Sequence, residues 1–316
     1  MQYVKLGNSG LDVSKICLGC MGFGNKIASN GTLDTSDDMK TIKYAIELGI
    51  NFFDTANECS SGQSEESLGI AINKHAVRDE VVIATKVHQE ISNSPNRGGL
   101  SRKHIFSKVN QSLNNLKSDY IDLLIINRWD YNTPIEETMR ALDDLVKSGK
   151  VHYLGASSMY AWQFSKAMYV AENHGWTKFI TIQNSYNLLY REEEREMMPL
   201  CRDLKIAMTP CEPLAQGRLT NDWVENSLNS KDNFIEEPDI EIFEALMQLS
   251  KKTKAKINQL ALAWLLYKNP VVSPVVNATK KTQLDEVIGA LNIPLTEDDI
   301  KTLESAYIPH KNIEYL

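Results

Sequence analysis

The sequence predicts an α/β fold in which eight strand–helix units close into a (β/α)8 barrel. The main observation is a regular alternation: apolar runs of about four to six residues are followed by amphipathic stretches of ten or more. Such alternation is typical of a parallel sheet, either a closed barrel or an open doubly wound sheet. Eight units within 316 residues favour the barrel, as a single domain over residues 1–316.

Each element has its own signal in the sequence. Tyr3–Leu6 and Leu11–Val13 flank a Gly-Asn-Ser-Gly turn and predict a hairpin ahead of the barrel. Thr296 and Asp299 form a capping-box pattern that predicts an extra helix at the end. The predicted strands are 16–19, 50–53, 81–84, 121–126, 151–155, 179–182, 206–208 and 271–276. The predicted helices are 37–48, 101–116, 135–147, 160–174, 192–204, 239–253, 256–267, 282–291 and 296–306.

Composition excludes several classes of protein. A formal net charge of -7 argues against a nucleic-acid binder. We find no apolar leader and no long uncharged apolar run, so we expect neither secretion nor membrane insertion. The five cysteines are an odd count and indicate free thiols in a reducing cytoplasm. Residues 89–100 and 216–238 are longer than connectors need to be and are candidate lids.

Polar side chains stand where the predicted strands end, and in a barrel these ends share one mouth. Asp54 ends the run Asn51-Phe52-Phe53, and Lys86 follows Val-Val-Ile-Ala-Thr. A lysine there would be buried and would need a partner, so we predict an Asp54–Lys86 ion pair. The pair is either a plain structural contact or one that tunes a neighbouring proton donor. The glycines of residues 19–24 lack the spacing of a dinucleotide-binding G-x-G-x-x-G loop.

A set of short stretches spread over nearly the whole chain is distinctive: LGCMGFG (18–24), FFDTAN (52–57), ATK (84–86), YIDLL (120–124), RWDY (128–131), GASS (155–158), QNSYN (183–187), PLAQGRL (213–219), and ATK (278–280) followed by QLDE (283–286). Through these stretches the chain resembles the aldo-keto reductases. The resemblance implies a (β/α)8 barrel that binds NADP(H) at its mouth. It also implies hydride transfer to or from a carbonyl carbon.

The resemblance assigns four catalytic positions, and this chain departs at two. The family's Asp and Lys fall on Asp54 and Lys86, its proton-donating Tyr falls on Cys59, and its substrate-orienting His falls on Asn127. A cysteine is too short to reach the place of the phenol and, beside a lysine, could ionise to a nucleophile. An asparagine still donates a hydrogen bond, but it cannot titrate.

The cofactor positions are also partly altered. Cys211 and Glu212 replace an aromatic residue that stacks on nicotinamide and a small polar residue, and Asn277 replaces a glycine. A carboxylate near a diphosphate is repulsive. Ser157, Ser158 and Gln183 would hold the carboxamide. The positions that the resemblance assigns to NADP(H) are Gly19, Met21, Asp54, Ser157, Ser158, Gln183, Cys211, Glu212, Leu214, Gln216, Gly217, Arg218, Asn277, Lys280, Gln283 and Glu286.

Three functions therefore remain open. The first is an NADP(H)-dependent reductase with an unusual proton donor, acting on a small carbonyl, alcohol or sugar-like molecule beside Phe23 and Trp129. The second is a barrel of low activity with a binding or regulatory role. The third is lyase, isomerase or thiol chemistry at the same mouth. Cys20, Cys59 and Cys211 could approach Zn²⁺ geometry, but relatives without a metal share Cys20, so we expect no metal. The sequence does not fix the oligomeric state.

Overall fold

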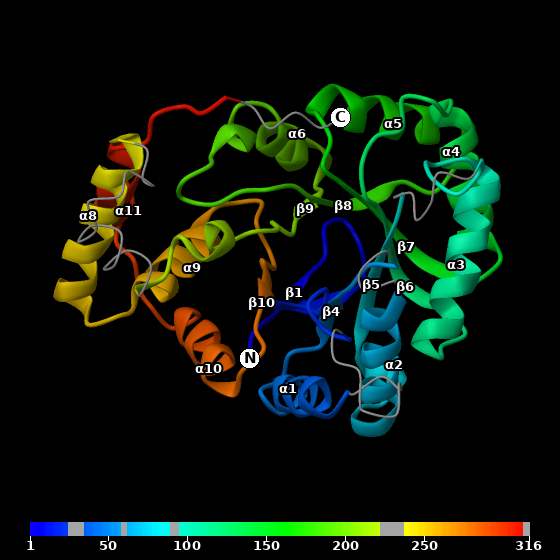
Figure 1. Ribbon diagram of the computed structural model, residues 1–316. Coiled ribbons are helices and arrows are strands. Elements are labelled where there is room, and N and C mark those ends of the chain that lie inside the picture. The colour runs from blue at the N-terminus through cyan, green and yellow to red at the C-terminus, as the bar shows by residue number, and fades with distance from the viewer. Residues whose placement is uncertain (25–34, 58–61, 89–94, 222–236, 312–316) are drawn as a thin grey trace.

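The computed structural model describes residues 1–24, 35–57, 62–88, 95–221 and 237–311. Eight parallel strands follow one another around a barrel in the order β10-β3-β4-β5-β6-β7-β8-β9, with helices outside them (Figure 1). The strands are β3 (Cys17–Gly19), β4 (Phe52–Asp54), β5 (Val82–Val87), β6 (Ile121–Ile126), β7 (Val151–Ser157), β8 (Phe179–Gln183), β9 (Ala207–Met208) and β10 (Val275–Asn277).

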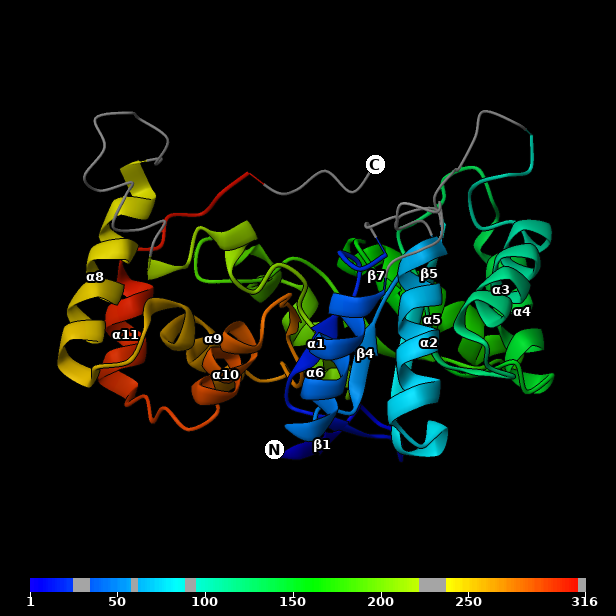
Figure 2. The same cartoon turned by 60° about the horizontal axis from the view of Figure 1, so that its bottom comes forward.

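Backbone contacts next to the short strands β9 and β10 join these two strands and close the barrel. Val275 N donates to Pro210 O at 2.9 Å, and Met208 forms a parallel bridge with Val271. A two-stranded antiparallel hairpin, β1 (Tyr3–Lys5) and β2 (Asp12–Ser14), lies at the end of the barrel where the chain begins (Figure 2). Leu6 of its turn is fully buried and belongs to the apolar cluster inside the barrel. The predicted fold class and the hairpin are thus confirmed.

The helices cover the strands from outside. They are α1 (Ser36–Glu47), α2 (Gln63–His75), α3 (Arg102–Leu116), α4 (Ile135–Lys147), α5 (Ala161–His174), α6 (Met197–Leu204), α8 (Glu237–Thr253), α9 (Ile257–Tyr267), α10 (Lys281–Ala290) and α11 (Glu297–Ser305). The predicted cap of α11 is present, because Thr296 Oγ1 accepts from Asp299 N. Helix α3 is capped in the same way, since Ser101 Oγ accepts from His104 N. None of the described helices is long and apolar enough to cross a membrane.

Two elements differ from the prediction. Helix α2 was not predicted, because its buried face is built mainly from small or polar residues such as Ser64, Glu65 and Gly69 rather than from an apolar stripe. The helix predicted over 192–204 is divided into a 3-10 turn (Glu192–Glu194) and α6, because Glu196 has non-helical backbone angles.

The strands separate an inner core from an outer one. Along β5, Val82 and Ala84 belong to the inner cluster, whereas Ile83 and Val87 pack outward against the helices. Successive side chains of a strand point to opposite faces. Lys86 therefore has the register of an inward-facing residue, and the polar groups at the strand ends converge above the inner cluster.

Candidate active site

The Asp54–Lys86 pair lies at the mouth of the barrel. The two side chains are 0% and 4% exposed, and Lys86 Nζ lies 2.5 Å from Asp54 Oδ2. Lys86 Nζ also donates to Thr55 O at 3.3 Å, and Gln183 Nε2 donates to Asp54 Oδ1 at 3.4 Å. Removing one partner would leave the other as an unpaired buried charge, which costs free energy. The folded state therefore keeps the two side chains in contact.

A second polar network, which the sequence did not reveal, fixes the chain around this pair. Glu65 is fully buried, and its carboxylate accepts hydrogen bonds from Thr85 (2.7 Å), Asn57 (3.0 Å) and Asn115 (2.9 Å). Thr85 immediately precedes Lys86, and Asn57 lies three residues beyond Asp54. The only signal in the sequence was a glutamate within a polar run after a strand, a pattern that normally indicates a solvent-exposed helix start.

Asn127 is half-buried at the end of β6, and its backbone N donates to Val87 O at 3.0 Å. This bond places Asn127 beside His88, the residue that follows β5. His88 Nδ1 is buried and has no hydrogen-bond partner among the described residues. Burial lowers the pKa of His88 to about 4; nearby Asp130 opposes this shift. We did not identify His88 from the sequence, although strand alternation from Lys86 would have pointed to it.

Cys59, the predicted position of the proton donor, lies outside the described residues. Two other cysteines, Cys17 and Cys20, are buried thiols whose pKa values are well above the ordinary value because of burial and the nearby Asp54 carboxylate. Both are therefore protonated at neutral pH and are not nucleophiles. No group of three metal-ligating side chains converges anywhere in the described ranges.

Hydroxyl and amide groups line the ends of β7 and β8. Ser157 Oγ donates to Gln183 O at 2.6 Å and lies 3.2 Å from Ser158 Oγ. Ser158 has a φ of 48°, in the left-handed region. Because Gln183 also contacts Asp54, these three residues connect directly to the ion pair. Their uncharged donors and acceptors suit an amide group.

The loop after β9 presents a thiol and a carboxylate. Burial, together with the adjacent Glu212, raises the pKa of the Cys211 thiol to about 12. Glu212 is exposed, and its carboxylate accepts from Ser185 Oγ at 3.1 Å and from Gln216 Nε2 at 2.7 Å. The φ angles of Glu212 (53°) and Gln216 (56°) are in the left-handed region, so this loop has an unusual, compact path.

A pocket of about 320 Å³ opens beside this loop. Its charged lining residues are Glu212, Arg218 and Lys311, together with His310. Arg218 is anchored by an ion pair with the buried Asp239. The two cations fit an anionic group such as a diphosphate, and Glu212 is the one acidic side chain of the lining that opposes it. The charged side chains of this pocket therefore fit the diphosphate of a dinucleotide, although the negative charge of Glu212 weakens its binding.

The predicted adenosine-binding residues already have partners within the protein. Gln283 Oε1 accepts from the backbone N of Thr279 (2.9 Å) and of Lys280 (3.1 Å), which caps α10. Glu286 accepts from Lys256 at 2.5 Å. Asn277 lies against Gly19, where an added Cβ would come within 2.3 Å of Asn277 Oδ1. Met21 is half-buried, as is Leu214, while Gly217 has open space around it.

Two aromatic residues were predicted to line a substrate pocket. Phe23 and Trp129 are 2% and 7% exposed, and both pack into the outer apolar cluster. Trp129 contacts the exposed Trp162 with ring centroids 5.7 Å apart. Of these three aromatic residues only Trp162, at the start of α5, is exposed, so Phe23 and Trp129 are wall residues rather than pocket surface.

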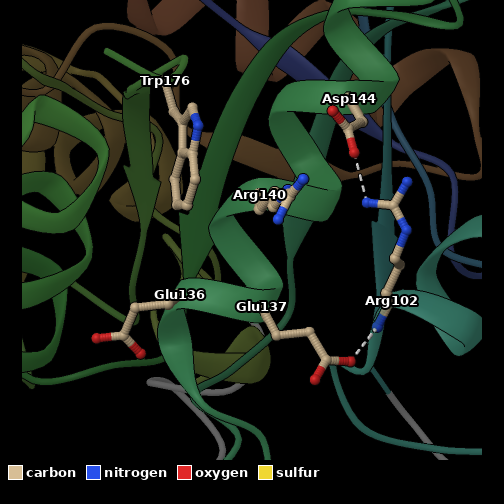
Figure 3. Close-up of a pocket in the computed structure, with 6 residues that line it drawn as sticks. All are labelled: Arg102, Glu136, Glu137, Arg140, Asp144 and Trp176. Atoms are coloured by element: carbon tan, nitrogen blue, oxygen red, sulfur yellow. Dashed lines mark hydrogen bonds and ion pairs between the residues drawn. The ribbon is translucent and has the colours of Figure 1, made fainter. Parts of the chain in front are cut away.

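A larger pocket, of about 570 Å³, lies on the outer helix layer (Figure 3). It is lined by residues of α3 and α4 and by Trp176. Arg102 Nη1 lies 2.5 Å from Asp144 Oδ2, and Arg102 N donates to Glu137 at 2.9 Å. None of its lining residues comes from a strand end, so it is separate from the ion pair of the mouth.

The structure is a (β/α)8 barrel with a buried Asp–Lys pair at the C-terminal ends of its strands, the end of the barrel at which barrel enzymes have their active sites. The Aldo/keto reductase family profile matches residues 15–308. The versiconal hemiacetal acetate reductase of Aspergillus parasiticus is 39% identical, over 98% of this chain and 98% of its own length. Putative aryl-alcohol dehydrogenases of Schizosaccharomyces pombe and Saccharomyces cerevisiae are 41% and 36% identical, over 97% and 98% of this chain and 96% and 98% of their own lengths.

The chain belongs to the aldo-keto reductase family. It is therefore an oxidoreductase, of a family that generally uses NAD(P)H and acts on small carbonyl compounds or alcohols.

Proposed function

We propose that this protein is an NADP(H)-dependent reductase that transfers hydride between the cofactor and a small carbonyl compound or alcohol. The observation that carries this proposal is the buried Asp54–Lys86 ion pair at the barrel mouth, in a chain of this family. A fixed ammonium in a water-poor site stabilises negative charge on an oxygen that forms beside it. The cytoplasm, where thiols stay reduced, is the proposed location.

The cofactor, when bound, supplies or accepts the hydride. Ser157, Ser158 and Gln183 hold its carboxamide through uncharged hydrogen bonds. The loop from Leu214 to Arg218 binds its diphosphate against the repulsion of Glu212. Lys280 binds the 2′-phosphate of the cofactor. Gln283 and Glu286 bind the adenosine, and to do so they give up their present hydrogen bonds within the protein.

The proton takes an unusual route in this proposal. Cys59 is too short to bring a proton to the place that a tyrosine hydroxyl would occupy, so a water held by Asn127 and Lys86 delivers it. Asn127 donates a hydrogen bond to the substrate oxygen but does not titrate. Lys86 favours the anionic form of the donor because its positive charge lies close by.

The proposed substrates are aromatic aldehydes and their alcohols. Two of the similar proteins are named as putative aryl-alcohol dehydrogenases. In this chain Trp162 packs against the buried Trp129 and presents an exposed ring near the rim, on which a planar ring can stack. An aldehyde group next to such a ring can reach the polar mouth while the ring stays on the apolar wall.

Fluorescence titration of the purified protein with NADPH and with NADH tests the proposal. We expect NADPH to bind with a Kd on the order of 1–10 μM and NADH at least about tenfold more weakly, which is about 1.4 kcal/mol. Failure to bind either cofactor at high micromolar concentration would contradict the proposal and favour the non-redox alternatives.

A pair of matched variants tests the altered proton donor. Cys59→Tyr combined with Asn127→His should raise kcat for aldehyde reduction by about 10- to 100-fold, because it restores a positioned proton donor. The control is Cys59→Phe with Asn127→His, which supplies the ring without the hydroxyl and should give no such gain. Equal rates for the two variants would show that the donor is not what limits the reaction.

A further inference from the structure

His88 occupies a position on the barrel mouth that the proposed mechanism does not use. It lies two residues beyond Lys86, directly after β5. Residues two apart on a strand share one face, and Lys86 faces Asp54 in the barrel interior. In the register of β5 and β6, Lys86 pairs with Ile125 and Val87 with Ile126. The next pair in this register is His88 and Asn127.

The backbone of His88 is held in place from outside the barrel. Its carbonyl accepts a hydrogen bond from Gly99 N at 2.7 Å. Gly99 has a φ of 77°, and an added Cβ would come within 2.5 Å of Asp130 Oδ2. The same Asp130 oxygen accepts from Leu100 N at 2.7 Å. Asp130 thus holds the loop at Gly99 and Leu100 in place, and this loop in turn fixes the backbone of His88.

The state of the imidazole suits a hydrogen bond to a neutral ligand. The charged groups around it are Asp130 and Arg128, which follow β6, and His104 of α3; Lys86 lies on its own strand. Burial, with help from Arg128 and His104 and against Asp130, lowers the pKa of His88 to about 4. The ring is therefore uncharged at neutral pH. Its buried Nδ1 has no hydrogen-bond partner among the described residues, a costly arrangement that a bound polar atom would relieve.

We propose that His88 orients the substrate: its neutral imidazole donates a hydrogen bond to the carbonyl or alcohol oxygen, beside the amide of Asn127. Together the two side chains take the role that the family gives to a histidine at position 127. The proposal rests on the reductase function proposed above and adds a residue to it. His88 transfers no proton, because a neutral imidazole is a very weak acid. The proton still comes from the donor described above.

Variants of His88 test this role against a purely structural one. His88→Phe keeps a buried ring and removes both nitrogens; His88→Asn keeps an amide near the place of Nδ1. The matched control is His104→Phe, since His104 is a buried histidine that, like His88, has a ring nitrogen without a hydrogen-bond partner among the described residues. We expect His88→Phe to lower kcat/KM for an aromatic aldehyde by about 10- to 100-fold, with NADPH affinity within about twofold of the wild type. His88→Asn should recover at least a third of that loss on a logarithmic scale.

Rescue by a second change distinguishes orientation from folding. Adding Asn127→His to His88→Phe supplies the imidazole from the adjacent strand and should restore kcat/KM to within about fivefold of Asn127→His alone. Persistence of the full loss in this double variant would mean that His88 acts only through the fold, and would overturn the proposal.

A spectroscopic measurement needs no turnover. In protein with ¹⁵N-labelled histidine, adding benzyl alcohol together with NADP⁺ analogues that cannot accept hydride should shift the His88 imidazole nitrogens and leave those of His104 unchanged. No shift at saturating ligand would overturn the proposal.

The outcomes also separate this proposal from the function on which it rests. If the wild type binds no NADPH and reduces no aldehyde, both fail. If the wild type is active and His88→Phe matches it within about twofold, the role of His88 is wrong and the reductase function stands.

Discussion

At the scale of single residues, Lys86 combines deep burial with a direct contact to Asp54. Lys86→Met removes the cation and leaves a buried carboxylate unpaired, so we expect the free energy of unfolding to fall by about 3–5 kcal/mol. The measurement is denaturation by urea at pH 7. Lys40→Met is the control, because Lys40 forms an exposed pair with Asp37 and should change stability by less than about 0.5 kcal/mol. A loss below about 1 kcal/mol for Lys86→Met would contradict the buried pair.

Glu212 gives a prediction about the cofactor. Glu212→Gln keeps the shape of the side chain and removes its charge, so we expect NADPH to bind about 3- to 10-fold more tightly at low salt. Added salt should diminish this gain, because it screens the repulsion in the wild type. Glu196→Gln, at another exposed acid near the rim, is the control and should leave Kd unchanged. Unchanged or weaker binding for Glu212→Gln would place the diphosphate elsewhere.

Single residues also show the limit of reading a site from sequence. Asp54 and Lys86 were predicted as a pair because a charged residue at the end of an apolar strand is rare and needs a partner. Glu65 and His88 were not identified. Glu65 looks like a solvated residue in a polar run, and only the tertiary contacts with Thr85 and Asn57 reveal its burial.

At the scale of elements, the contact between α2 and α3 depends on a glycine. An added Cβ at Gly69 would lie 2.4 Å from Leu116 O, and backbone cannot yield there. Gly69→Ala should therefore lower the free energy of unfolding by about 1–3 kcal/mol. In an unconstrained helix the same change would raise stability by about 0.5–1 kcal/mol.

Gly10→Ala is the matched control, since nothing lies within 4 Å of an added Cβ at Gly10. Both variants are compared with the wild type by urea denaturation. A stabilised Gly69→Ala protein would show that the two helices do not pack as closely as described.

The same contact explains why α2 escaped prediction. Helices such as α4 have an apolar stripe, and their bounds follow from the sequence alone. On α2 the close approach to α3 requires Gly69, and other buried positions hold small polar residues: Ser67 donates to Asp38 of α1, and Ser64 Oγ lies 2.9 Å from Thr55 Oγ1. The apolar stripe that reveals most helices is therefore weak in α2.

At the scale of the whole molecule, stability should depend on pH through buried histidines. The pKa values of His88 and His104 are lowered in the folded protein, mainly by burial, to about 4 for His88. The unfolded chain then binds more protons than the folded one between about pH 4 and 6.5, so stability falls as pH falls through this range.

Urea denaturation at pH 7, 6 and 5 measures this dependence. Between pH 7 and 5, His88→Phe should lose about 1–2 kcal/mol less stability than the wild type, because one of the two titrating rings is gone. Identical slopes for the two proteins would mean that His88 is not held neutral by the fold.

The barrel as a whole was predictable because its signal repeats. Eight alternations of strand and helix, with a hairpin before them and a capped helix after them, agree on one architecture even though single boundaries shift by a few residues. Chemistry does not repeat in this way. It depends on single side chains at the barrel mouth, and no periodicity in the sequence reveals the role of each one.

Hydride transfer itself is the most direct test of the central claim. The wild-type protein is mixed with an aromatic aldehyde and NADPH that carries deuterium in the transferable position, and the alcohol product is analysed by mass spectrometry. The reductase function predicts an alcohol with one deuterium on the alcohol carbon. It also predicts that this deuterated alcohol no longer forms when the Lys86→Met variant is used. An alcohol without deuterium, or no alcohol from a protein that binds NADPH, would contradict it.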